Sequence, residues 1–138
     1  MQLQLMAEDE KEYENDPKRL DDAKNLQEIY EKFELEKQFL ADYTSVSKAI
    51  QDDIERMLIR LYKIDDPTQI DATHNSKIDV LGYPVYHMKT ADGYRLYYTY
   101  SKTSAKPIHI LCHCIKSKQD TYFNKMKNSE TLKKKFRN

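Results

Sequence analysis

The chain has 138 residues, of which 33% are charged and 39% are apolar, with two glycines and four prolines. This length suits one domain and is too short for two independent cores. Eleven tyrosines and four phenylalanines argue against a largely disordered chain. No apolar run approaches the roughly 18 residues of a membrane span, and no signal-peptide pattern opens the chain, so we expect a cytoplasmic protein without membrane contact.

The formal net charge is zero, but the charge is unevenly spread. Residues 1–28 hold nine acids against four bases, whereas residues 116–138 hold eight bases against two acids. This asymmetry indicates either a body that faces a polyanion and carries an acidic appendage, or simply a solvated basic tail.

The first half of the chain predicts mostly helix. Asp16-Pro17 is typical of a helix start, and a short helix follows. Alternation over residues 29–35 predicts a strand. Apolar residues at steps of three and four over 36–63 predict two helices, the second capped by Thr44 or Ser45. A loop over 68–81 carries His74, which we expect to be exposed.

The second half predicts three strands, over residues 84–90, 94–101 and 107–115, because each is rich in aromatic and β-branched residues. The order β-α-α-β-β-β predicts an α+β fold: a small antiparallel sheet packed against an N-terminal helical hairpin. We expect an acidic N-terminal extension over 1–28 and a basic C-terminal helix or tail over 125–138. The residues expected to pack against the helices are Tyr94, Leu96, Tyr98 and Tyr100.

The motif Cys112-His113-Cys114 lies inside the last strand. Cysteines two apart in a strand do not easily close a disulfide, which favours reduced thiols. Without a second ligand pair, the motif favours small residues packed in a sheet over a zinc site. We therefore expect neither a metal nor a cofactor.

The turn between the strands predicted over residues 84–90 and 94–101 decides which of their side chains face each other. A three-residue loop, Ala91-Asp92-Gly93, would pair Lys89 with Arg95 and His87 with Tyr97 on one face. A two-residue Asp92-Gly93 turn would slip the register by one residue and separate them. In the first register two cations face each other without an acid, which fits either a phosphate site or side chains spread into solvent.

Residues 85–122 resemble the C-terminal sheet of the RelE/ParE toxin superfamily. The likeness lies chiefly in Gly93-Tyr94-Arg95-Leu96-x-Tyr98, followed by a hairpin, an apolar strand, a lysine-rich exit and Tyr122. The short strand near Phe33, two helices and Leu81-Gly82 extend it upstream. The resemblance covers residues 29–124 and leaves 1–28 outside.

This resemblance implies the toxin of a type II toxin–antitoxin system. Members of the RelE branch are ribonucleases that cut messenger RNA in the ribosomal decoding site, whereas the ParE branch inhibits DNA gyrase without known hydrolysis. It therefore implies an endoribonuclease toxin that inhibits translation, with ribosome-bound messenger RNA and a cognate antitoxin as partners. The alternative is a non-enzymatic protein of the same fold, either a gyrase inhibitor or a degenerate member that only binds partners.

The resemblance also implies a set of site residues. His87 stands where RelE-type members carry a lysine, and Lys116 stands near the place of an arginine. RNA cleavage by the 2′-hydroxyl needs a base, which His87 would supply, and cations on the phosphate. The candidate catalytic residues are His87, Lys89, Arg95, Lys116 and Tyr122. The candidate substrate-binding residues are Tyr97, His113 and Lys118, and His113 shares strand parity with His109.

Residues 1–28 are the part of the chain that such toxins lack. One hypothesis is that this acidic segment shields the basic sheet from RNA, as an antitoxin would. The other is a solubilising extension.

Overall fold

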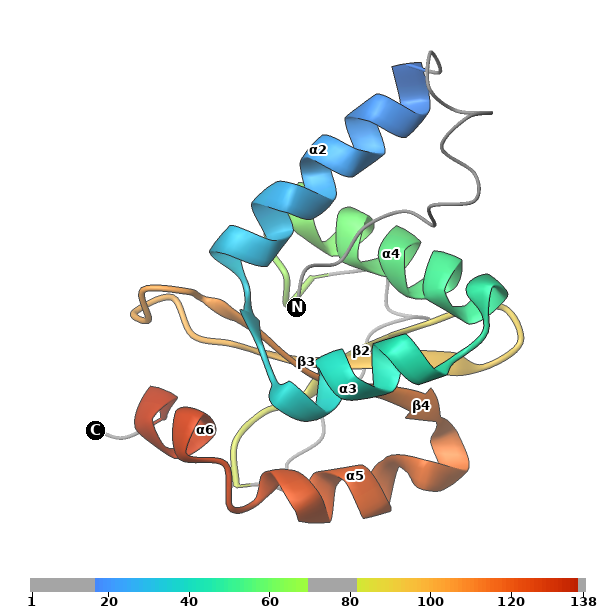
Figure 1. Ribbon diagram of the computed structural model, residues 1–138. Helices are drawn as coiled ribbons and strands as arrows, with labels where there is room; N and C mark the ends of the chain where they lie inside the picture. The colour runs from blue at the N-terminus through green and yellow to red at the C-terminus, as the bar shows by residue number, and fades with distance from the viewer. Residues whose placement is uncertain (1–16, 70–81, 137–138) are drawn as a thin grey trace.

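The computed structural model describes residues 17–69 and 82–136 (Figure 1). These form an α+β fold with the expected element order from the first strand onward. The helices are α2 (Pro17–Lys32), α3 (Lys37–Ser45), α4 (Lys48–Lys63), α5 (Gln119–Met126) and α6 (Glu130–Lys135), with a 3₁₀ turn, η2 (Lys116–Lys118). The strands are β1 (Glu34–Leu35), β2 (Tyr86–Lys89), β3 (Tyr94–Tyr100) and β4 (Ile108–Ile115). His74 lies outside the described residues.

The four strands form one sheet in the order β1-β4-β3-β2. β2, β3 and β4 are antiparallel, as predicted, but β1 runs parallel to β4, pairing Glu34 with His109 and Leu35 with Ile110. The sheet is therefore mixed. Because β1 is only two residues long, its direction depends on where α2 and α3 place it and not on a pattern of its own.

The strand predicted over residues 29–35 is wrong in its first part. α2 continues to Lys32, and the strand is confined to Glu34–Leu35. Leu26, Ile29 and Phe33 are all buried in the main core, at the spacing of one helical face. α2 thus runs through residue 28, where we expected the extension to end, and packs against α4.

The cap of α4 is Ser47, whose hydroxyl accepts from the Ile50 amide at 3.4 Å. Thr44 and Ser45 donate instead to carbonyls of their own helix, Ala41 and Asp42, so the predicted caps are wrong. The predicted apolar stripe is confirmed, and α4 ends before Asp65-Asp66-Pro67 as expected. Its buried members are Ile54, Met57, Leu58 and Leu61, with Ile50 packed at the margin.

Both faces of the sheet are covered. α2 and α4 lie above it in Figure 1, and α5 and α6 lie below it. Met88, Leu96 and Tyr98 belong to the core on the first side, and the half-buried Tyr94 packs against it, as predicted for Tyr94, Leu96 and Tyr98. Tyr100 is half-buried. On the other side, Tyr97 packs with Phe123 and other residues of a second core. The C-terminal segment therefore supplies core residues, which its charge did not indicate.

A β-bulge in β4 changes which face of the sheet its side chains point to. Tyr97 pairs with Cys112 but Tyr98 pairs with Ile110, which leaves Leu111 as the extra residue. The alternation of side chains therefore shifts by one along β4. His109 and His113 therefore lie on opposite faces of the sheet, although their shared strand parity placed them on one face.

One carboxylate joins three distant segments. Glu36, between β1 and α3, contacts His109 of β4 (Oε1 to Nε2, 2.9 Å) and accepts from the Ser129 hydroxyl at 2.7 Å. Ser129 also caps α6 by accepting from the Leu132 amide at 3.2 Å. Because the carboxylate lies between the serine and the histidine, the group is a structural junction and not a nucleophilic triad, in which the histidine is central.

We predict that this junction makes the protein sensitive to acid. Burial raises the pKa of the Glu36 carboxyl, but the hydrogen bonds from His109 and Ser129 outweigh it and hold the pKa below its ordinary value of 4.5. The charged carboxylate therefore stabilises the fold above pH 4.5, and this contribution is lost as the pH falls through the lower folded value.

The measurement is urea unfolding of the wild type and Glu36→Gln from pH 7 to about pH 3. The wild type should lose more free energy of unfolding below pH 4.5 than the variant. Glu130→Gln, at a residue whose side chain is 84% exposed, is the control and should follow the wild type. Parallel pH profiles for the wild type and Glu36→Gln would contradict the prediction.

Candidate functional site

The β2–β3 hairpin adopts the register that brings the candidate residues together. The Thr90 amide donates to the Tyr94 carbonyl at 2.9 Å, and the Gly93 amide donates to the Thr90 carbonyl at 3.0 Å. Gly93 has φ +89°, which only glycine adopts without strain. Lys89 pairs with Arg95 and His87 with Tyr97. The three-residue turn is thus confirmed, and the two-residue alternative is excluded.

Arg95 and His87 are in direct contact. Nη1 of Arg95 lies 3.0 Å from Nε2 of His87. An arginine can only donate, so Nε2 must be the unprotonated acceptor and the imidazole must be neutral. His87 is 5% exposed. Nε2 of His87 can accept a proton only if Arg95 gives up this hydrogen bond, either by moving away or by donating to another acceptor.

Arg95 also has an unused donor. Its Nε is buried and has no hydrogen-bond partner among the residues that the structure describes, although the Arg95 side chain also hydrogen-bonds with Tyr97. Within the same ranges, neither Arg95 nor the facing Lys89 forms a salt bridge. A buried donor without an acceptor is costly. A ligand with anionic oxygens would satisfy both the donor and the two uncompensated charges.

The two cysteines lie on the face of Arg95. Cys114 pairs with Arg95 and Cys112 with Tyr97, and both thiols are free and buried. A hydrogen bond from Cys112, assisted by the nearby Arg95 charge, lowers the pKa of Cys114 and outweighs its burial. No group of three or more histidine, cysteine, aspartate or glutamate side chains in residues 17–69 and 82–136 is arranged to hold a metal ion.

Two candidate substrate-binding residues lie inside the protein. Tyr97 is fully buried, with its ring 4.9 Å from Phe123 and its hydroxyl donating to Gln119 at 2.8 Å. His113 is 2% exposed, packs edge-on against Phe39 and contacts the Tyr94 hydroxyl through Nδ1. Burial lowers the pKa of His113 to about 4. Tyr97 therefore fixes α5 to the sheet, and His113 is neutral at pH 7 and faces the opposite side from Arg95.

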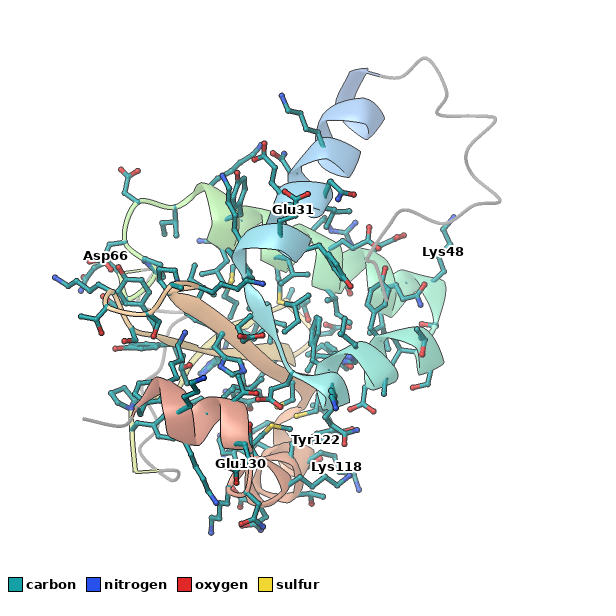
Figure 2. All side chains as sticks on the ribbon, turned by 60° about the vertical axis from the view of Figure 1, so that its left-hand side comes forward. Glu31, Lys48, Asp66, Lys118, Tyr122 and Glu130 are labelled. Carbon is teal, nitrogen blue, oxygen red and sulfur yellow. The ribbon has the colours of Figure 1, made fainter. Side chains whose placement is uncertain are left out.

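The remaining candidates lie just beyond the end of β4. Lys116 and Lys118 are exposed in η2, and Tyr122 is half-buried in the first turns of α5. Ile115 pairs with Tyr94, so these residues follow the same end of the sheet as Arg95. Figure 2 shows Lys118, the last residue of η2, near Tyr122 of α5.

Sequence reasoning missed Asp42 as a neighbour of Tyr122. Burial, together with the charge of Asp42 and a hydrogen bond to it, raises the pKa of Tyr122. Lys125 places its Nζ 5.2 Å from the centre of the Tyr122 ring. Asp42 lies on α3, and no sequence pattern links that helix to α5. The structure thus groups His87, Lys89 and Arg95 on the hairpin, and Lys116, Lys118 and Tyr122 beyond β4.

Comparisons with protein-family models, curated proteins and solved structures find no match for this chain. In the part of the chain that the structure describes, no helix has the length and apolar character needed to cross a membrane.

Proposed function

We propose that the protein is a toxin of the RelE kind, which cleaves messenger RNA on the ribosome and thereby inhibits translation. The observation that carries the proposal is the partnerless Nε of Arg95, beside His87 and facing Lys89, with no carboxylate in a salt bridge to either cation in the described ranges. A scissile phosphate would supply the missing acceptor. The element order from β1 to β4 also agrees with the resemblance.

In this proposal the hairpin residues have distinct roles. Arg95 binds the phosphate oxygens as a planar fork, and Lys89 adds a second positive charge. When Arg95 turns toward the phosphate, Nε2 of His87 becomes free to accept the 2′-hydroxyl proton. The 2′-oxygen then bonds to phosphorus as the bond from phosphorus to the 5′-oxygen breaks, and the leaving 5′-oxygen takes a proton from water. Lys116 and Lys118 bind neighbouring phosphates, and Tyr122 stacks on a base.

The second candidate is a non-enzymatic protein of the same fold, which binds a partner such as gyrase. The burial of His87 and its contact with Arg95 favour this alternative, because a base held by a donor is not poised to accept a proton. The two candidates differ in whether RNA is cut.

We predict that Arg95→Ala abolishes messenger RNA cleavage in cells. Loss of one charge-stabilising donor typically costs about 10²- to 10³-fold in rate. The measurement is primer extension on cellular messenger RNA after induced expression. Arg56→Ala is the matched control, since Arg56 is exposed and pairs with Asp53 on its own helix. Cleavage should persist in this variant. If expression of the wild type arrests growth but leaves messenger RNA uncut, the non-enzymatic alternative is favoured.

We predict that His87→Gln lowers cleavage by about 10²- to 10⁴-fold, the usual contribution of a general base. The glutamine amide oxygen can still accept from Arg95, so the contact survives while proton transfer is lost. The thermal unfolding midpoint should stay close to that of the wild type. Cleavage at the wild-type rate in His87→Gln would show that His87 only positions Arg95.

The cognate antitoxin and shielding by residues 1–28 also remain proposals. Deleting all of 1–28 would remove Leu26, which is 1% exposed in the main core, so a shorter truncation that ends before Pro17 is the suitable variant. If the acidic segment shields the basic surface, this truncation should bind single-stranded RNA more tightly than the full chain. Equal dissociation constants for the two forms would exclude shielding by the removed segment.

A further inference from the structure

A cavity lies on the same side of the sheet as α5 and α6. Its volume is about 490 Å³, which is in the range of small-ligand sites. It lies between the segment that leads into β2, the end of α5, and α6. Met126 and Leu132, which are 3% and 1% exposed, contribute apolar lining.

Two aromatic rings line this cavity. Tyr83 and Phe136 are stacked, with centroids 4.3 Å apart and an interplanar angle of 8°. Both are partly buried against the second core. They come from segments more than fifty residues apart in the chain, so the sequence offers no indication of the pair. A stacked pair presents flat apolar surface, which suits a flat ring.

The cavity also has a positive rim. Lys127 and Lys133 line it and are exposed. Two acids lie nearby: Glu130 is 84% exposed at 3.8 Å from Lys133, and Glu36 adds to burial in raising the pKa of Tyr83. The Glu36 carboxylate already accepts from Ser129 and contacts His109. The described part of the C-terminal segment, residues 116–136, carries seven lysines and two acids.

We infer that this cavity binds one nucleotide of single-stranded RNA, with the base against the Tyr83–Phe136 pair and the phosphate at Lys127 and Lys133. Aromatic stacking combined with a basic groove is the usual chemistry of single-strand recognition. The choice of RNA rests on the proposed function, and the site would be a second contact for the same strand.

The position of the cavity fits a strand that passes the hairpin residues. Tyr83 precedes β2, and the turn at residues 91–93 lies at the opposite end of that strand. The seven residues of β3 span roughly 20 Å at 3.3 Å per residue. α5 lies below the sheet (Figure 1), and its exposed Lys125 lies between η2 and the cavity along the chain. Several nucleotides would therefore separate the two sites.

The test is fluorescence anisotropy with a labelled single-stranded RNA of about ten nucleotides, without ribosomes. Lys127→Ala/Lys133→Ala should weaken binding at least fivefold more than Lys102→Ala/Lys134→Ala, which removes the same charge from exposed lysines outside the cavity. The dependence of log K on log salt should also become shallower by about 0.7 for each lost phosphate contact. If both double variants weaken RNA binding equally, the proposal that the cavity binds a nucleotide is overturned.

A second variant tests the stacking. Phe136→Leu keeps an apolar side chain but removes the ring, and should weaken RNA binding by about tenfold with little change in the unfolding midpoint. RNA that carries 4-thiouridine should crosslink to Tyr83 or Phe136 on irradiation. Unchanged affinity in Phe136→Leu without a crosslink at either ring would overturn the inference.

The two proposals can fail separately. If neither the wild type nor the truncation that ends before Pro17 binds RNA in the anisotropy assay, the cavity is overturned as an RNA site, whereas primer extension decides cleavage on the ribosome independently. If Arg95→Ala abolishes cleavage while the two lysine double variants bind RNA equally well, the hairpin site stands and the cavity site falls.

Discussion

The register of β3 between its two neighbours is the constraint on which the other features depend. β3 is the central partner of β2 and β4, and residues Leu96 to Thr99 are buried within it. A slip by one residue would exchange Leu96 and Tyr98 with Arg95 and Tyr97 between the two cores. The positive φ of Gly93 and the bulge at Leu111 hold this register from either side. The contact of Arg95 with His87 follows from it.

Burial on both faces leaves only a small part of the sheet for chemistry. Tyr97, Cys112 and Phe123 fill the second face, so polar groups there are inside the protein unless they lie near the hairpin turn. Arg95 is only half-buried and keeps an unused donor. The same packing of α5 and α6 that closes the face also creates the cavity beside Tyr83 and Phe136. The C-terminal segment therefore contributes both to the second core and to the lining of this cavity.

The predictions that succeeded depend on local patterns. Ile54, Leu58 and Leu61 recur at helical spacing, and the turn before Tyr94 contains the glycine that a three-residue hairpin requires. The errors arose where a local pattern was ambiguous. Ile29 and Phe33 fit a strand or a helix face over so short a stretch, and packing of α2 on α4 decided for the helix.

By itself the sequence determined the α+β class and the order of the elements from the first strand to the last, because periodicity and turn chemistry act between near neighbours in the chain. It limited the hairpin to two registers, and the structure selected the one that pairs Lys89 with Arg95. Only the tertiary structure decided that His109 and His113 face opposite sides, that Tyr97 is buried and that Asp42 lies near Tyr122. These outcomes depend on a bulge and on helices packed across long sequence separations. Such contacts form because apolar surface must be covered, and the covering segment can come from anywhere in the chain.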